Sequence, residues 1–154
     1  MQPIEIKIQG IIPKTSTEIC SLFQETERWS EFKGYSILPG VKSAEFITRT
    51  PEMVGSRIQV QNTDGTSHIE EIIEWDVQRR VVLRMQGFGA PLKHIATHFI
   101  ETWEFRPAPG GTDATRDMRF YPRGLLGWLA LLPISRLMKK AFEANLAESQ
   151  GKQS

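Results

Sequence analysis

Three charged side chains share strand-like segments with apolar residues, and they are the strongest candidates for chemistry. Glu71 alternates with apolar residues in 67–75, Glu101 in 97–106, and Arg116 in 114–121. Successive side chains of a strand point to opposite faces, so regular strands would direct all three charges to the apolar side of a sheet. Burying a charge without a partner is costly, and we therefore expect Arg116 to pair with a carboxylate.

Glu101 is the favoured partner of Arg116, because 97–106 and 114–121 follow one another and are expected to pair as antiparallel neighbours. Three interpretations stay open. The charges form a structural ion pair, or the strands bulge so that the charges reach solvent, or the charges orient a ligand in an otherwise apolar pocket. An acid–base enzyme would also need a carboxylate of raised pKa, so the sequence assigns no catalytic residue.

No other group of residues predicts a reaction centre. His94 and His98 stand four residues apart, but they fall in a loop and at the start of a strand, so no metal site is predicted. His68 lies beside a hairpin turn and is expected to be exposed. Cys20, the only cysteine, is expected to pack on a short helix. The sequence contains no glycine-rich phosphate loop and no HExxH motif, and no cofactor is predicted.

A series of short strands must position these candidates. Residues 4–9 alternate apolar and polar residues, as a half-buried strand does. Thr15 and Glu18 predict a capping box at the start of a short helix, and a second short helix or turn is expected around Trp29. Six more strands are predicted at 41–49, 56–62, 67–75, 81–87, 97–106 and 114–121. Their connections are too short for helical crossovers, so we expect an antiparallel sheet.

A long helix is predicted near the end of the chain. From Ile134 to Leu146 apolar residues recur at three- and four-residue spacing, with charged residues on the other face. The preceding stretch, 125–132, is apolar on nearly every side, and we interpret it as core rather than as a membrane contact. Pro133 is expected to kink the helix or to divide it in two.

Composition indicates one globular domain at 1–149 and a disordered tail at 150–154. Of the 154 residues, 40% are hydrophobic and 24% charged, and the formal net charge is +1. This near balance argues against nucleic acid as a partner. The single cysteine and the absence of a signal-peptide pattern favour the cytoplasm. The longest uncharged stretch is too short to span a bilayer, so we expect no stable insertion, while peripheral contact stays open; the oligomeric state is not indicated.

The order of these elements resembles that of the SRPBCC superfamily, which includes START domains and the bacterial polyketide cyclase/dehydrase-like proteins. Three patterns carry the resemblance: Arg28-Trp29-Ser30-Glu31-Phe32 at the second helix, Val54-Gly55-Ser56-Arg57 before the third strand, and the hairpin from Glu74 to Val82. The resemblance implies an α+β helix-grip fold, in which a curved seven-stranded antiparallel sheet wraps around a long C-terminal helix. Two short helices would lie between the first and second strands. No catalytic residue is carried over, because the superfamily shares none.

The resemblance implies a cavity for a hydrophobic ligand and leaves three functions open. The first is a carrier or sensor that binds a small hydrophobic or aromatic molecule between the sheet and the C-terminal helix. The alternative is a polyketide cyclase/aromatase-type enzyme that uses polar groups of the cavity. The second alternative is a lipid- or quinone-presenting module that docks through 125–132. The residues expected to contact ligand are Trp29, Glu71, Trp75, Phe88, Glu101, Trp103, Arg116, Met118, Phe120, Trp128 and Leu132.

Overall fold

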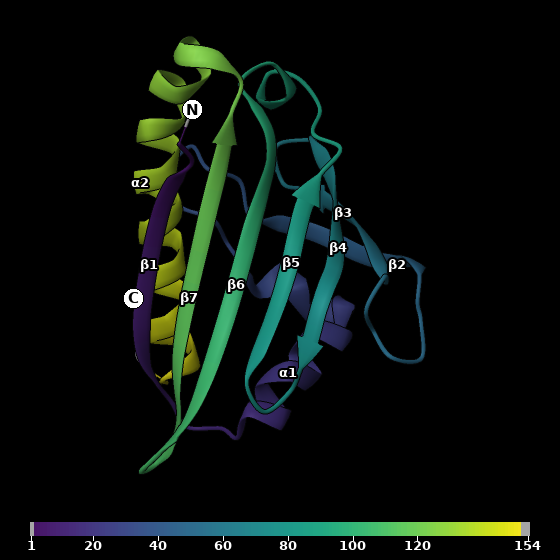
Figure 1. Cartoon of the computed structure of the whole chain (residues 1–154), viewed down its shortest axis with the longest axis vertical. Helices are drawn as coiled ribbons and strands as arrows, with labels where there is room; N and C mark the ends of the chain where they lie inside the picture. Colours follow the sequence, from purple (N-terminus) through teal and green to yellow (C-terminus); the bar gives the residue numbers. More distant parts are fainter. Residues whose placement is uncertain (1, 152–154) are drawn as a thin grey trace.

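Seven strands and two α-helices make up most of the chain (Figure 1). The computed structural model describes residues 2–151. In chain order the elements are β1 (Ile4–Ile12), α1 (Ser16–Gln24), the 3-10 helix η1 (Thr26–Glu31), β2 (Val41–Thr48), β3 (Arg57–Asn62), β4 (Ser67–Asp76), β5 (Arg80–Gln86), the 3-10 helix η2 (Leu92–His94), β6 (Ala96–Ala108), β7 (Gly111–Pro122) and α2 (Gly124–Ser149).

The strands form one antiparallel sheet in the order β1-β7-β6-β5-β4-β3-β2. Strands β2 to β7 are therefore joined to their chain neighbours, and β1 completes the sheet at the β7 edge, with Ile4 opposite Phe120 and Ile12 opposite Thr112. The predicted seven-stranded antiparallel sheet is confirmed. So are the two short helices between the first and second strands, α1 and η1, and the capping box of Thr15 and Glu18.

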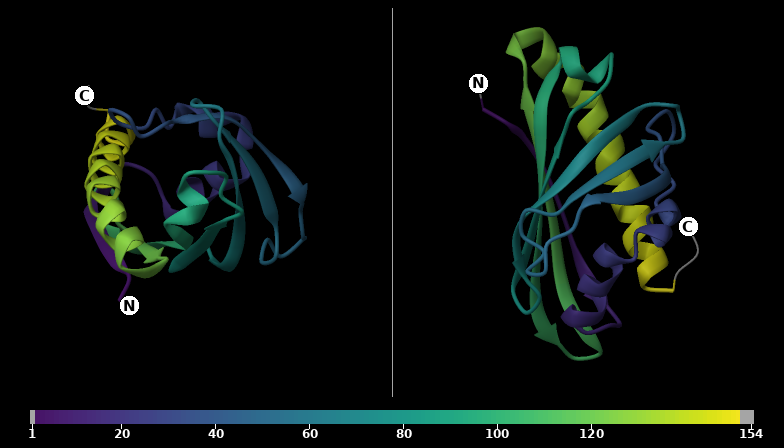
Figure 2. Two further views of the ribbon diagram at one scale, coloured as in Figure 1. Left: turned by 90° about the horizontal axis from the view of Figure 1, so that it is seen from above. Right: turned by 90° about the vertical axis from the view of Figure 1, so that its right-hand side faces the viewer.

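The sheet is curved, and α2 crosses its concave side (Figure 2). From the helix, Leu131, Met138 and Phe142 are buried against a cluster that includes Phe99 and Phe120 of the sheet. A second buried cluster lies between the other half of the sheet and α1, and it includes Ile19, Ile58, Ile72, Leu83 and Phe105. The helix-grip fold expected from the sequence is thus the fold of this chain.

The structure excludes one of the two alternatives for Pro133 and corrects the expectation for 125–132. The helix is continuous from Gly124 to Ser149, so Pro133 does not divide it. Pro133 is exposed, and the carbonyl that loses its usual amide donor can therefore turn toward water. The stretch 125–132 is not core on most sides: Leu125, Leu126 and Leu129 are 62%, 81% and 50% exposed.

The end of the helix is tied to the first strand. Gln150 is the C-terminal cap residue of α2, and its side-chain amide donates to the carbonyl of Ile11 at 2.9 Å. Of the tail expected at 150–154, residues 152–154 lie outside the described residues.

The start of α2 is held by a close approach that only glycine permits. A Cβ added at Gly127 would lie 2.4 Å from the carbonyl oxygen of Ile95. Helix propensity alone would favour alanine by about 0.5–1 kcal/mol. Overpacking typically costs about 1–3 kcal/mol, so we predict that Gly127→Ala lowers the free energy of unfolding by about 1–2 kcal/mol.

Chemical denaturation would measure this loss. Gly89→Ala is the control, because a Cβ at Gly89 meets nothing within 4 Å. A Gly127→Ala protein as stable as the wild type would mean that the helix start is free to move away from Ile95.

Candidate functional site

A cavity of about 460 Å³ lies between the concave face of the sheet and α2. Its walls come from α1, η1, β4, β5, β6, β7 and α2, together with the loops before β2, after β3 and after β5. Most lining side chains are aliphatic or aromatic, among them Phe23, Trp29, Phe32, Leu83, Met85, Phe88, Phe99, Trp103, Met118, Ile134, Leu137 and Phe142. This volume and lining are typical of pockets that bind small organic molecules.

An ion pair between Arg116 and Glu101 forms part of the wall. The Nε of Arg116 donates to Oε2 of Glu101 at 2.7 Å, and the two side chains are only 13% and 7% exposed. The same oxygen accepts from the indole nitrogen of Trp103 at 2.8 Å. The Nη1 of Arg116 donates to Oδ1 of Asn145 on α2 at 3.1 Å. The predicted pair is confirmed, and it joins β7, β6 and α2.

Aromatic rings enclose the guanidinium of Arg116. Its central carbon lies 3.7 Å from the ring centre of Phe142, 4.8 Å from that of Trp103 and 5.8 Å from that of Phe32. Cations are attracted to ring faces, so these contacts add to the ion pair. Among the described residues no protein group accepts a hydrogen bond from Nη2. Arg116 lines the cavity, and Nη2 is the one nitrogen of its guanidinium without an acceptor among these residues.

The expectation that Glu71 points inward is wrong. Glu71 is half-buried and pairs with Arg57 at 3.5 Å, whereas its neighbour Glu70 is buried and lines the cavity. The cause is a β-bulge in β4 between Ile72 and Glu74. The extra residue reverses the alternation. Trp75 and Glu71, four residues apart, would share a face in a regular strand, but the bulge places them on opposite faces.

A second polar group of the cavity was not expected. His68, predicted to be exposed, is buried, and its Nε2 lies 3.0 Å from Oε2 of Glu70. The other ring nitrogen, Nδ1, lies 3.2 Å from the amide nitrogen of Asn62. All three residues line the cavity. The consecutive apolar residues Ile72 and Ile73 are the sequence signal that could have indicated the bulge and this shift of face.

The remaining expected contact residues divide into three groups, the third of which is Trp75 alone. Trp29, Phe88, Trp103 and Met118 line the cavity. Phe120 is fully buried in the core, and Trp128 and Leu132 are half-buried on α2; none of these three lines the cavity.

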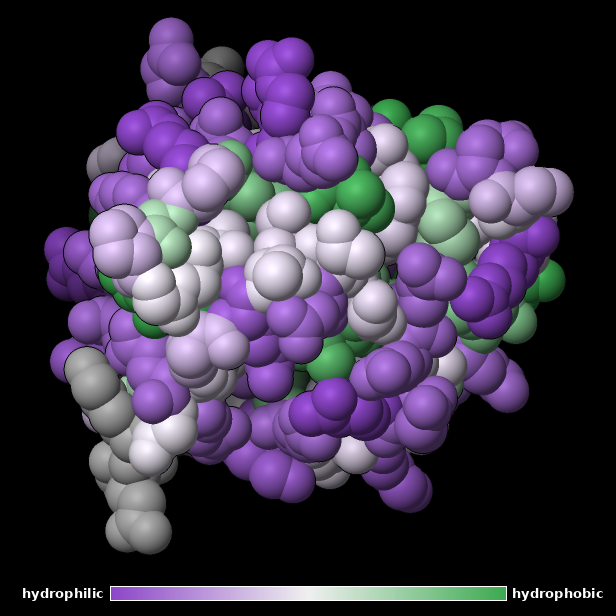
Figure 3. All heavy atoms as spheres, turned by 90° about the horizontal axis from the view of Figure 1, so that it is seen from below, coloured by the Kyte–Doolittle hydropathy of each residue, from purple (hydrophilic) through white to green (hydrophobic). Residues whose placement is uncertain are grey.

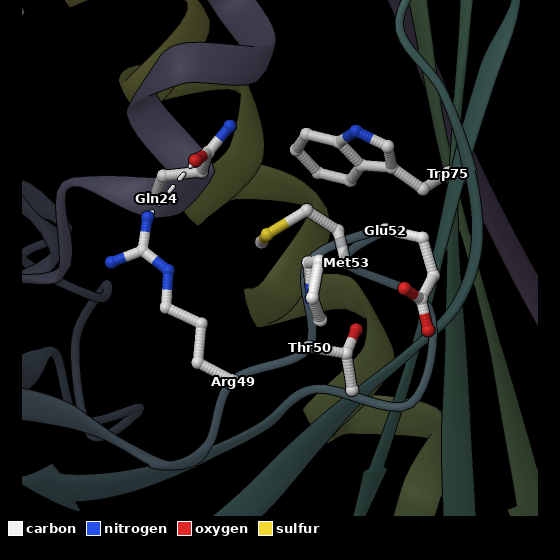
Figure 4. A pocket seen from close by; sticks show the side chains of 7 residues that line it. Gln24, Arg49, Thr50, Glu52, Met53 and Trp75 are labelled. Atoms are coloured by element: carbon white, nitrogen blue, oxygen red, sulfur yellow. Dashed lines mark hydrogen bonds between the residues drawn. The ribbon is translucent and has the colours of Figure 1, made fainter.

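Trp75 lines a different, open depression between the end of α1 and the loop after β2 (Figure 4). Arg49, Glu52 and Gln24 surround this depression, and Arg49 donates to Gln24 at 3.0 Å. Its rim is polar and exposed, so it is less suited than the central cavity to an apolar molecule.

Other candidate chemistry is limited within residues 2–151. No three histidine, cysteine, aspartate or glutamate residues gather there in a way that could hold a metal ion. Burial raises the pKa of the Cys20 thiol to about 12, which keeps it protonated and unreactive at neutral pH. In the described part of the chain, no helix is long and apolar enough to cross a membrane.

Comparison with protein families places this cavity in context. The family described as polyketide cyclase / dehydrase and lipid transport matches residues 13–149. The chain belongs to this family. The resemblance to the SRPBCC superfamily is thereby confirmed. Among curated proteins, none matches the sequence.

Solved structures share the fold of this cyclase and lipid-transport family member at low sequence identity. A protein from Thermus thermophilus is 18% identical with a TM-score of 0.69, covering 96% of this chain and 94% of its own. The di-domain ARO/CYC BexL from the BE-7585A biosynthetic pathway is 13% identical with a TM-score of 0.71, covering 99% of this chain and 50% of its own. The major latex-like protein 151 of Panax ginseng is 13% identical with a TM-score of 0.61, covering 91% of this chain and 97% of its own. At such identities the likeness shows the fold alone.

The buried ion pair makes a prediction about stability. Removing one partner of a buried pair leaves the other charge uncompensated, so Arg116→Met should lower the free energy of unfolding by about 3–5 kcal/mol. Adding Glu101→Gln removes that charge and keeps an acceptor for Trp103, so the double variant should recover much of the loss. A double-mutant cycle by chemical denaturation measures this coupling.

Arg80→Met is the control, because Arg80 pairs with Glu74 where both side chains are 48% exposed. Exposed pairs contribute about 0–1 kcal/mol, so this change should be nearly neutral. Additive effects of less than about 1 kcal/mol at Arg116 and Glu101 would contradict a buried, coupled pair.

Proposed function

We propose that this protein binds a small hydrophobic or aromatic molecule in the central cavity and acts as a carrier or sensor. The observation that carries the proposal is a cavity of about 460 Å³ with mainly apolar walls and a buried, oriented guanidinium in one of them. The family description, which includes lipid transport, supports the same class of ligand. A cytoplasmic location belongs to the proposal, and it agrees with a single buried cysteine.

The two kinds of wall have different tasks in this proposal. Aromatic and aliphatic side chains remove the ligand's apolar surface from water, which is the main source of affinity. Arg116 offers Nη2 to a carbonyl, carboxylate or hydroxyl oxygen, which orients the ligand and excludes hydrocarbons without such a group. The preferred ligand is therefore an apolar molecule with at least one oxygen acceptor.

Filling the cavity should abolish binding without unfolding the protein. Leu137 is half-buried and faces the cavity from α2, so Leu137→Trp adds bulk to its interior. We expect the affinity for the fluorescent apolar probe 8-anilino-1-naphthalenesulfonate to fall at least about tenfold, a loss of about 1.4 kcal/mol. Fluorescence titration of both proteins measures the change.

Arg136→Trp is the matched control, because it places the same side chain on the exposed face of the same helix. The probe should bind this variant as it binds the wild type. Equal loss in both variants, or none in either, would show that the probe does not enter the cavity and would count against the proposed function. Native mass spectrometry of the purified protein would independently detect a retained ligand.

The exposed leucines favour a second candidate function, the presentation of lipid at an anionic membrane surface. Leu125, Leu126 and Leu129 form an exposed apolar patch on the first turns of α2. Exposed basic residues precede and follow it in the chain: Lys93 and Arg123 before it, and Arg136, Lys139 and Lys140 further along α2; the segments 88–100 and 118–142 contain no acidic residue. The opposite end of the molecule shows hydrophilic residues around its rim, with apolar residues near its centre (Figure 3). Apolar side chains next to basic ones are typical of surfaces that bind anionic lipid.

This patch lies at the edge of the cavity. The side chain of Arg123 donates to the carbonyl of Lys93 in η2 at 2.8 Å, and Gly127 packs on the carbonyl of Ile95. Leu92 and Ile95, the neighbours of Lys93 in this segment, line the cavity. A membrane that bound the patch would therefore lie near the bound molecule.

Binding to vesicles tests this candidate. The wild type should sediment with vesicles of phosphatidylcholine and phosphatidylglycerol, and less with phosphatidylcholine alone. Changing Leu125, Leu126 and Leu129 to serine should weaken binding at least about tenfold, because each leucine loses apolar area that the bilayer would cover. Since these side chains are exposed, the variant should keep its stability.

Ile47→Ser with Ile73→Ser is the control, because these exposed residues lie on other parts of the surface, at 52% and 40% exposure. It should bind anionic vesicles like the wild type. Absence of wild-type binding, or equal loss in the control, would exclude the patch as a lipid contact. Loss of a solution dimer in the serine variant would show instead that a second copy covers it.

A further inference from the structure

A directed chain of hydrogen bonds ends at the carboxylate of Glu70 in the cavity. Thr66 donates its hydroxyl to Asp64 at 2.6 Å, so its oxygen is left to accept from the amide nitrogen of Asn62 at 3.1 Å. This contact fixes which end of the Asn62 amide faces His68, and the same nitrogen donates to Nδ1 of His68 at 3.2 Å. The ring proton therefore lies on Nε2, which donates to Glu70 at 3.0 Å.

The surroundings of Glu70 differ from those of the other buried carboxylate. Glu101 accepts from Arg116 and from Trp103, and the guanidinium balances its charge. Within residues 2–151, by contrast, no arginine or lysine pairs with Glu70, and His68 is the side chain that hydrogen-bonds to it. The other carboxylate oxygen of Glu70 has no protein donor among these residues, in a wall that also contains Met85 and Phe99, so it can approach a bound molecule directly.

We propose that Glu70 is a general base that removes a proton from a carbon atom of a molecule bound in the cavity, with His68 as its positioning residue. The substrate class is a carbon acid with an apolar body, such as a ketone with a hydrogen on the adjacent carbon. The C–H bond breaks, its electron pair forms the enolate, and the proton goes to the Glu70 carboxylate. Return of the proton to the oxygen or to another carbon completes an isomerisation that needs no oxidant, reductant or second substrate. The inference rests on the proposed function only in that the same cavity must admit the molecule.

The ring opening of 5-nitrobenzisoxazole tests the base directly. A base removes the hydrogen on the ring carbon, the nitrile forms, the N–O bond breaks, and the released cyanonitrophenolate is measured by its visible absorbance. General bases contribute about 10²–10⁴-fold, so Glu70→Gln should lower the enzyme-dependent rate at least a hundredfold. Glu71→Gln is the matched control, because the adjacent carboxylate pairs with Arg57 and does not line the cavity, and its rate should be that of the wild type.

Variants of His68 separate positioning from folding. His68→Ala should lower kcat several-fold and leave KM nearly unchanged, because the carboxylate stays but loses its orientation. His68→Gln can donate an amide hydrogen to Glu70 and should restore part of kcat. A rescue of this kind is not expected if His68 only fills space. If Glu70→Gln does not fold, Glu70→Asp takes its place. The aspartate keeps the negative charge, but its carboxylate lies one methylene further from the bound molecule.

Probe binding keeps the two proposals apart. The wild type and Glu70→Gln should both bind 8-anilino-1-naphthalenesulfonate, the variant at least as tightly, because the probe is an anion and the variant removes a negative charge from the cavity wall. Binding in both without any rate advantage of the wild type over Glu70→Gln would overturn the base and leave the proposed function intact. Absence of probe binding in the wild type would overturn the proposed function itself. A rate that survives in Glu70→Gln but is lost in Glu71→Gln would also overturn the assignment.

Discussion

A buried positive charge holds together the elements that surround the cavity. Arg116 belongs to β7, its carboxylate partner Glu101 to β6, and its amide partner Asn145 to α2. Phe142, also on α2, covers the guanidinium at 3.7 Å. Apolar contacts are non-directional and permit a helix to slide or rotate over a sheet, whereas hydrogen bonds to a charge do not. The position of α2, and with it the width of the cavity, therefore depends on this ionic contact as well as on packing.

The sequence predicts this contact because the strands concerned are regular. In β6 and β7 the alternation continues without a break between Phe99 and Phe105 and between Ala114 and Phe120, so parity places Glu101 and Arg116 correctly. In β4 the same reasoning fails, because one extra residue after Ile72 reverses the face. Strand alternation has a period of two. On one side of a single bulge, every residue expected to point inward therefore points outward, and the reverse. The fold depends on the average pattern and is insensitive to such a bulge. The identity of a site residue depends on the exact face of each side chain, so a bulge changes it.

Exposure of the first turns of α2 could not be predicted from their composition. Leu125, Leu126, Leu129 and Leu131 are chemically alike, and only Leu131 is fully buried. What separates them is the direction in which each side chain points: Gly127 faces Ile95 and Leu131 packs with Phe99 and Phe120, while Leu125, Leu126 and Leu129 are exposed. An apolar run therefore predicts that another surface covers it, but that surface need not belong to the same chain.

The two carboxylates of the cavity show how local donors divide structural from chemical tasks. Both are buried, both lie on strands of the concave face, and both line the same space. Glu101 accepts hydrogen bonds from a cation and from an indole N–H, so one of its oxygens is already engaged by the protein. Glu70 faces one imidazole, whose own orientation is fixed by Asn62. The same residue type is therefore suited to hold the helix at one position and to accept a proton at the other, and the number of donors around each decides which.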